Sequence, residues 1–147
     1  MLRNLLLACC LVFTTVNFGQ EKKLTCKDFK KGTFYSPVET ESPEKYIIIR
    51  NDSIQTEEIL NKSDITDSRR HKTIHGKLKW INDCDYIISY DKTKMIFGET
   101  EKFINKHGGV KTEMIKIKDK CYYYKSSLSV DGKTQVMKGK ICKGVPK

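Results

Sequence analysis

The sequence contains few arginines and none of the short motifs that usually mark an enzyme. Only four of its 28 basic residues are arginine. No pair of cysteines has the Cys-x-x-Cys spacing of zinc and redox sites, and no serine lies in a Gly-x-Ser-x-Gly turn. A glycine-rich loop that could hold a phosphate is also absent. We therefore predict no catalytic residues, and an enzyme is the least favoured of the functions considered.

The histidines do not have the spacing of a known metal site. His71 and His75 are four residues apart, but they lie in a segment that we interpret as a strand, and no glutamate follows His71 as in zinc proteases. Carboxylates such as Asp83 and Asp85 flank turns, where aspartate is common for backbone reasons. We predict neither a metal site nor a cofactor.

One long apolar run is present, at the N-terminus, and it has the form of an export signal. Arg3 precedes apolar residues 5–16, and Gly19 offers a cleavage point just before charged residues. We predict a signal peptide over residues 1–19 and a single β-rich domain over residues 20–147. The mature protein would then be exported, to the periplasm or out of the cell.

Two other interpretations of the N-terminal run stay open. A membrane-spanning helix needs about 20 apolar residues, and this run is shorter, so a retained anchor is less favoured. We expect no transmembrane span in the mature chain. Residues 6–9 also resemble the lipobox of a lipoprotein, but the apolar run continues past Cys9, where a lipidated cysteine should close it.

Removal of the signal would leave four of the six cysteines. An even number in an oxidising compartment favours two disulfides, with three possible connectivities. Residues 131–132 are Asp-Gly, a favoured pair for a two-residue type I′ turn. With that turn, Cys121 and Cys142 lie opposite each other in a non-hydrogen-bonded position, which allows a bridge. Cys26 and Cys84 then pair by elimination.

The same register aligns the apolar side chains of this hairpin on one face, which we interpret as a core face. They are Tyr122, Tyr124, Leu128, Val130, Met137 and Ile141. One pair counts against the register, because Lys125 would face Lys138 across the hairpin.

Short β-branched and aromatic runs, separated by turns, dominate the rest of the chain. The predicted strands are residues 29–36, 46–50, 54–60, 71–81, 84–90, 110–118, 121–130 and 133–142, with a loop over 61–70. One short helix is expected over residues 99–107, before two glycines. Short connections favour antiparallel neighbours, and closure removes exposed edges. We predict a mainly β, single-domain antiparallel meander, either a curved sheet or an up-and-down, lipocalin-like barrel.

Three stretches, residues 26–34, 46–53 and 78–86, carry a family resemblance, and the Trp-x-x-x-Cys-x-Tyr motif of the third is the most specific. Together they resemble a family of small exported proteins of Bacteroidetes, chiefly flavobacteria, whose function is not established. Some members carry the label DNA topoisomerase IV. The residues here argue against that activity, because a topoisomerase subunit needs an ATP-binding or DNA-cleaving domain far larger than this chain.

The formal net charge of +10 comes mainly from lysines spread along the chain, with one compact basic run at residues 69–72. Such a charge suits contact with anionic surfaces. A nucleic-acid reader would present arginines and aromatics together on one element. We therefore do not expect nucleic acid as the partner.

The aromatic residues are the better indication of a ligand. Trp80, Tyr122 and Tyr124 could line a cavity in the barrel and bind a small apolar ligand, or they could fill a solid core. We predict a non-enzymatic exported β-barrel that binds a small apolar ligand or an envelope component. The alternative is a secreted basic interaction protein that contacts an anionic glycan, a lipid or a protein partner.

Overall fold

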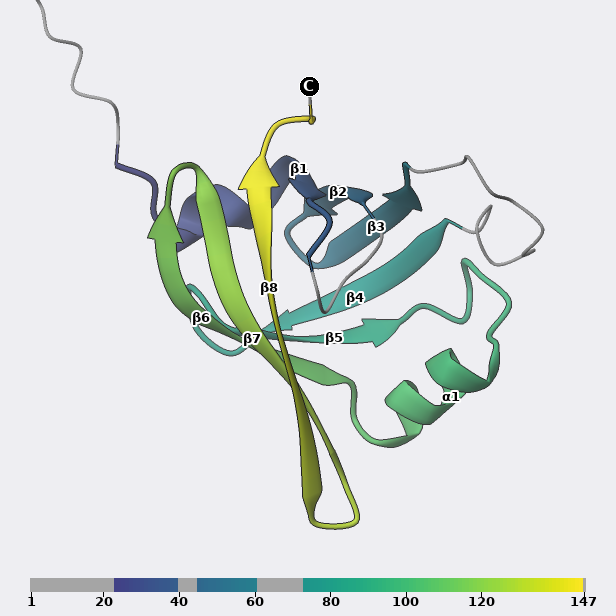
Figure 1. Cartoon of the computed structure of the whole chain (residues 1–147). Helices are drawn as coiled ribbons and strands as arrows, with labels where there is room; N and C mark the ends of the chain where they lie inside the picture. The colour runs from purple at the N-terminus through teal and green to yellow at the C-terminus, as the bar shows by residue number, and fades with distance from the viewer. Residues whose placement is uncertain (1–22, 40–44, 61–72, 147) are drawn as a thin grey trace, which may run out of the picture.

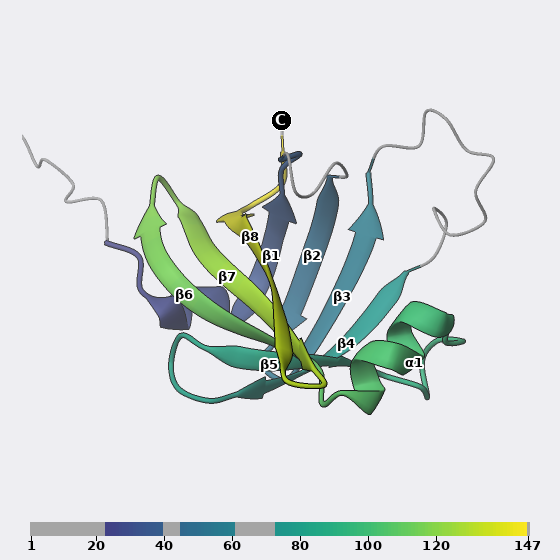
Figure 2. The same ribbon diagram turned by 60° about the horizontal axis from the view of Figure 1, so that its bottom comes forward.

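Eight antiparallel strands form one closed barrel in chain order, in a computed structural model that describes residues 23–39, 45–60 and 73–146 (Figures 1 and 2). The strands are β1 (Lys31–Ser36), β2 (Tyr46–Asn51), β3 (Ile54–Ile59), β4 (Ile74–Trp80), β5 (Tyr86–Tyr90), β6 (Val110–Lys118), β7 (Cys121–Val130) and β8 (Lys133–Lys143). A 3₁₀ helix, η1 (Cys26–Phe29), precedes β1, and the single α-helix, α1 (Glu99–Lys106), lies between β5 and β6. The predicted mainly β barrel with one short helix is confirmed.

Two of the predictions fall outside the described residues. These are the signal peptide over residues 1–19 and the loop over residues 61–70; His71 lies outside them as well. Within the described part of the chain, no helix is both long enough and apolar enough to cross a membrane.

The start of the first strand was predicted too early. Phe29 ends η1 rather than beginning a strand, and β1 starts at Lys31. The Asp28 carboxylate accepts hydrogen bonds from the backbone N–H and the hydroxyl of Thr25, both at 2.9 Å. This local bonding favours a helical turn, and the turn directs the fully buried Phe29 into the barrel.

The fifth strand also begins later than predicted, at Tyr86 rather than Cys84. The side-chain oxygen of Asn82 accepts hydrogen bonds from the backbone N–H groups of Cys84 and Asp85, each at 2.7 Å. Such bonds to nearby backbone stabilise a turn in competition with a strand ladder. The turn therefore extends to Asp85.

The β7–β8 hairpin has the predicted turn and register. Asp131 and Gly132 have φ values of 49° and 76°, as a type I′ turn requires. Ten residue pairs follow, and they include Cys121 opposite Cys142. Lys125 does face Lys138, but Glu113 on β6 also faces Lys125 and lies 3.2 Å from its ammonium group. The acidic neighbour thus offsets the like-charge pair.

The predicted core face of this hairpin is only partly buried. Tyr122 and Ile141 are each 1% exposed, whereas Met137 is 53% exposed. The reason is visible in Figure 1, where the tip of the hairpin extends well past the other strands. Only the part of the hairpin inside the barrel wall contributes to the core.

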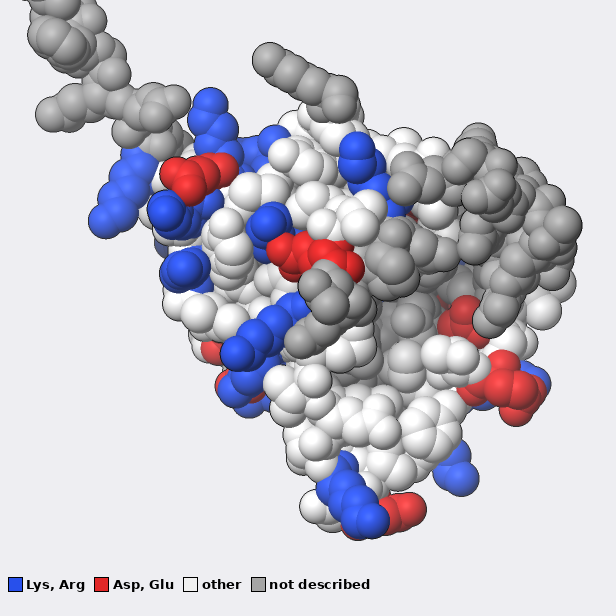
Figure 3. All heavy atoms as spheres, in the orientation of Figure 1, with Lys and Arg blue, Asp and Glu red and all other residues white. Residues whose placement is uncertain are grey.

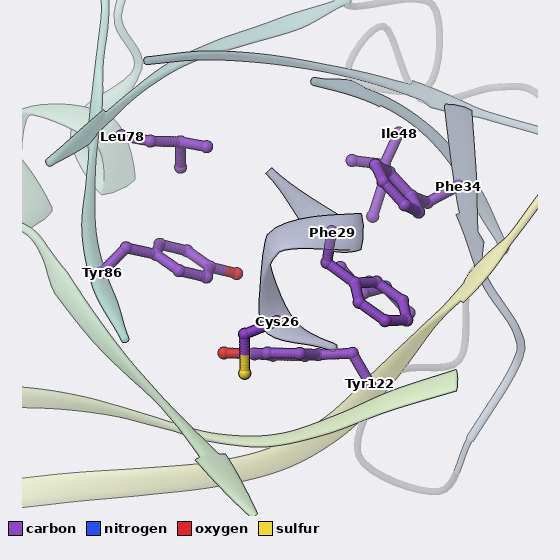
Figure 4. Close-up of a cluster of buried hydrophobic side chains, with 8 residues drawn as sticks. Cys26, Phe29, Phe34, Ile48, Leu78, Tyr86 and Tyr122 are labelled. Atoms are coloured by element: carbon purple, nitrogen blue, oxygen red, sulfur yellow. The ribbon is translucent and has the colours of Figure 1, made fainter. Parts of the chain in front are cut away.

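The core fills the end of the barrel that η1 crosses. Figure 4 shows side chains from opposite walls converging around this short helix. The buried cluster consists of Cys26, Phe29, Phe34, Ile48, Leu78, Tyr86, Tyr122 and Ile141. Phe29 stacks on Phe34 with ring centroids 5.5 Å apart and lies 5.4 Å from the ring of Tyr122. The helix η1 therefore closes this end, which we call the closed end.

Candidate functional site in the barrel interior

Arg50 is the most deeply buried charged residue among those described, with 2% of its surface exposed. Its guanidinium donates hydrogen bonds to the carbonyl oxygen of Phe29 at 3.0 Å and to the hydroxyl of Tyr86 at 2.5 Å. Its Nε donates to Oε1 of Gln55 at 2.7 Å. The cation is thus bonded to neutral acceptors from η1, β3 and β5, and it ties these elements together.

Aromatic rings also surround the guanidinium of Arg50. Its central carbon lies 4.7 Å from the ring centroid of Tyr86, 5.8 Å from that of Phe34 and 6.0 Å from that of Trp80. The π faces of these rings are electron-rich and attract a cation. Hydrogen bonds and rings together compensate the loss of water around this charge.

Gln55 connects Arg50 to a second charged group, Glu57. Its Nε2 donates to Oε1 of Glu57 at 2.5 Å while its oxygen accepts from Arg50. Gln55 and Glu57 are two apart on β3 and therefore point to the same, inner face. Glu57 pairs in register with Ile48 on β2 and with Ile74, the first residue of β4, in the last pair of the β3–β4 ladder.

The environment of Glu57 shifts its ionisation. Burial raises the pKa of the Glu57 carboxyl above its usual range, while the hydrogen bond from Gln55 and the charge of Arg50 partly lower it. The carboxyl group therefore ionises as a buried group does, although the residue as a whole is only half-buried.

The ionisation of two inward-facing tyrosines is shifted as well. Burial, together with smaller contributions from the charges of Glu57 and Glu101, raises the pKa of Tyr90 to about 12. Burial likewise raises the pKa of Tyr124, with contributions from Tyr86 and Glu57. Glu57, Tyr90 and Tyr124 are thus inward-facing titratable groups on β3, β5 and β7, and burial raises the pKa of each.

Inward-facing residues beyond the closed end are incompletely covered. They are half-buried, whereas the core cluster is at most 8% exposed. We call this region the open half of the interior and define it by Tyr46, Glu57, Ile88, Tyr90, Met114, Tyr124 and Ser126. These side chains thus keep part of their surface accessible, and Tyr46, Ile88, Met114 and Tyr124 among them pack against the core cluster.

Two glycines make room for side chains of the open half. A Cβ atom on Gly139 would lie 2.6 Å from the hydroxyl oxygen of Tyr124, which faces it across the β7–β8 pair. A Cβ atom on Gly76 would lie 2.8 Å from the Cδ1 atom of Ile88. Any larger residue would move Tyr124 or Ile88 away from the wall.

The three residues predicted to line a cavity occupy different environments. Tyr122 is 1% exposed, belongs to the core cluster and donates a hydrogen bond to the carbonyl of Cys84 at 2.6 Å. Trp80 packs against the core, and its indole N–H donates to the carbonyl of Asp52 at 2.8 Å. Tyr124 also packs against the core, from the side of the open half, with its ring centroid 6.2 Å from that of Tyr122.

The polar residues of the interior were missed in the sequence. Gln55 and Glu57 lie in an alternating strand, where polar residues at every second position usually mark the face in contact with water. Arg50 follows three isoleucines and is equally typical of a strand end. The one available signal was the isolation of this arginine in a lysine-rich chain, since arginine is preferred for buried, multiply bonded positions.

Both predicted disulfides are confirmed. Cys26 is bonded to Cys84, which ties η1 to the turn before β5. Cys121 is bonded to Cys142 across β7 and β8. Within the ranges that the structure describes, no group of three or more His, Cys, Asp or Glu residues could hold a metal ion.

The outer surface of β6, β7 and β8 carries a second arrangement of note. Lys116, Tyr123 and Lys140 lie side by side on these strands. The two ammonium groups lie 5.1 Å and 5.6 Å from the ring centroid of Tyr123. Glu39 forms an ion pair with Lys140 at 2.9 Å. Figure 3 shows basic side chains spread over this side of the molecule, with acidic ones among them.

Comparison of the chain with protein-family models, with curated proteins and with solved structures finds no match. The interior of the barrel therefore has to be interpreted from its own residues.

Proposed function

We propose that the barrel binds a small ligand with an apolar body in the open half of its interior. The observation that carries this proposal is the partial exposure of inward-facing residues there, next to a core cluster whose residues are at most 8% exposed. Ile88, Met114 and Tyr124 offer apolar and aromatic contacts. A few polar groups, Glu57 among them, could orient the ligand, as in most small-molecule sites.

Binding of the neutral apolar dye N-phenyl-1-naphthylamine tests this proposal, because its fluorescence rises in an apolar environment. The matched variants are Ser126→Phe, which adds a ring inside the open half, and Ser127→Phe, which adds the same ring outside. We expect Ser126→Phe to weaken dye binding about tenfold or more and Ser127→Phe to leave it unchanged. Equal effects of the two variants, or no dye binding by the parent protein, would contradict the proposal.

Export is the second part of the proposal. Two disulfides in a chain with an N-terminal apolar run support an oxidising compartment, periplasmic or extracellular. Export also agrees with the resemblance to exported flavobacterial proteins. Intact-mass measurement of the protein from a periplasmic fraction should give a chain that begins near Gln20 and has no free thiol. A retained N-terminus or four free thiols would count against export.

The outer surface of β6–β8 supports a second candidate function, contact with an anionic polymer or surface. Nine lysines and only three acidic residues lie between Val110 and Lys143. Tyr123, between Lys116 and Lys140, adds a flat ring against which a sugar could stack. Glu113 forms ion pairs with Lys111 and Lys125, so part of this charge is already compensated.

Heparin and vesicles of anionic lipid are suitable probes of this surface. The variant Lys116→Gln/Lys140→Gln should reduce retention on heparin and weaken the salt dependence of binding. The control Lys92→Gln/Lys94→Gln removes the same charge from the exposed loop after β5. Equal effects of the two double variants would show that binding depends on net charge and not on this surface. Binding to the vesicles but not to heparin would indicate a lipid and not a glycan.

A further inference from the structure

The residues that define the open half include one acidic side chain and no basic one. Of the seven residues that define it, Glu57 alone is charged, and it is linked to the rest of the protein through Gln55. Tyr90 and Tyr124 face inward as well, because Tyr90 pairs with Gly76, which pairs on its other side with Gln55, and Tyr124 pairs with Met114. A ligand in the open half would therefore meet the carboxyl group of Glu57 and inward-facing phenol rings.

The interior cation is not available to such a ligand. Arg50 is 2% exposed, and its donors are bonded to Phe29, Gln55 and Tyr86. An anionic group of a ligand would approach Glu57 without a free cation among the described residues of the open half. A region of low polarity strengthens that repulsion, because charges are poorly screened there.

The carboxylate retains capacity for a further donor. An ionised carboxylate can accept about four hydrogen bonds, and the part of the chain that the structure describes supplies one, from Gln55 to Oε1. Glu57 also keeps accessible surface. An ammonium group bonded to a carboxylate and placed over tyrosine rings is stabilised by charge-assisted hydrogen bonds and by the π faces.

We infer that the ligand is a small amine with an apolar or aromatic body, whose ammonium group binds Glu57 in the open half of the barrel. This inference rests on the proposed function and adds the chemical class of the ligand. Ile88, Met114 and Tyr124 would contact the body. Glu57 would select the charge, since an anionic head group is repelled by its carboxylate and a neutral one brings no opposite charge to it.

Displacement of bound N-phenyl-1-naphthylamine tests this inference with three compounds that share one aromatic body. Tyramine has a cationic head, 4-ethylphenol is neutral and 3-(4-hydroxyphenyl)propanoate is anionic. At neutral pH we expect tyramine to displace the dye at a concentration about tenfold or more below that of 4-ethylphenol. The anionic compound should be the weakest.

The matched variants are Glu57→Gln and Glu58→Gln, which remove the same charge from the inner and the outer face of β3. Glu57→Gln should still bind the dye but lose the preference for tyramine, and Glu58→Gln should keep it. If the three compounds displace the dye equally, if none displaces it, or if Glu57→Gln retains the preference, the inference is wrong and the proposed function stands. If the parent protein does not bind the dye, the proposed function fails, and this inference fails with it.

Discussion

At the scale of single residues, Arg50 is the clearest case of a side chain whose removal should be costly. Its three hydrogen bonds hold Phe29, Gln55 and Tyr86 in place, and all three of these residues are buried. A buried polar group that loses its partner pays the full cost of desolvation. Removal of Arg50 is therefore costly because its buried hydrogen-bond partners would lose their donor.

We expect Arg50→Met to lower the free energy of unfolding by about 2–4 kcal/mol, because three acceptors lose their donor. Urea denaturation followed by fluorescence measures this loss. Lys79→Met is the control, since it also replaces a basic residue by methionine, at an exposed position on β4. A loss no larger than that of the control would mean that Arg50 contributes no net stability.

Glu57 should make the stability of the protein depend on pH in an unusual direction. Its pKa in the folded protein is raised above the usual value of 4.5, mainly by burial. The neutral form is thus favoured in the fold, so this contribution is fully present below about pH 4.5 and is lost as the pH rises through the folded-state pKa. The groups that act on it or share its region are Arg50, Gln55, Tyr90 and Tyr124.

Unfolding free energies of the parent protein and of Glu57→Gln, measured from about pH 4 to pH 8, test this prediction. The parent should lose stability relative to the variant as the pH rises. Glu58→Gln, which changes an exposed residue on the same strand, should show no such trend. A difference between parent and Glu57→Gln that does not change with pH would contradict the prediction.

These two residues also show where inference from the sequence stops. Tyr122 and Ile141 were expected in the core because aromatic and branched side chains alternate in a hairpin with a defined register. The inward position of Gln55 and Glu57 could not be derived in that way. It depends on a bond between Gln55 and an arginine on the neighbouring strand, which only the closed fold brings into place.

At the scale of secondary-structure elements, local turn chemistry decided which boundaries were predictable. The β7–β8 hairpin follows from Asp131 and Gly132, and its ten pairs agree with the register derived from that turn. The helix η1 was missed because its four residues form no period that a sequence pattern could reveal. Besides the local bonds between Thr25 and Asp28, the burial of Phe29 and the Cys26–Cys84 bond stabilise it, and these are tertiary contacts.

The side chain of Asn105 connects α1 to the end of β5. Its Oδ1 accepts from the backbone N–H of Tyr90 at 2.8 Å, and its Nδ2 donates to the Tyr90 carbonyl at 2.9 Å. Pairing of β5 with β6 ends at Ile88. The amide of Asn105 therefore takes the place of a strand partner at the end of β5.

We expect Asn105→Ala to lower the free energy of unfolding by about 1–2 kcal/mol, because two backbone groups lose their partner. Amide hydrogen exchange is the more specific measurement, since the N–H of Tyr90 should exchange faster while the paired N–H groups of β7 stay protected. Lys106→Ala, a change at the next position of the same helix, is the control. Unchanged exchange at Tyr90 would show that α1 is held by other contacts.

At the scale of the whole molecule, the barrel is held unevenly around its circumference. The β7–β8 pair extends over ten residue pairs, whereas among the described residues β8 pairs with β1 at Phe34–Lys143 and Tyr35–Cys142, with one further backbone hydrogen bond from Gly144 to Thr33. Closure therefore relies on the contents of the barrel as much as on its seam. The core cluster around η1 connects the strands on both sides of that seam, since it includes Phe34 from β1 and Ile141 from β8.

The two disulfides should contribute differently to this closure. Cys26–Cys84 spans 58 residues and Cys121–Cys142 spans 21. Loop entropy alone assigns them about 4 and about 3 kcal/mol. The first bond also fixes η1, which places Phe29 in the core, whereas the second joins two strands that are already paired along their length. We therefore expect the free energies of unfolding lost on removal of the two disulfides to differ by more than loop entropy alone predicts.

Urea unfolding of Cys26→Ala/Cys84→Ala and of Cys121→Ala/Cys142→Ala measures this difference, each variant serving as the control for the other. The first should lose more stability by over about 1 kcal/mol, and its closed end should loosen, with faster hydrogen exchange at β1 and β5. The second should keep the protection of the β7–β8 ladder. Equal losses would mean that η1 stays in the barrel without its covalent tie, and that the packing of Phe29 against Phe34 and Tyr122 is sufficient to close this end.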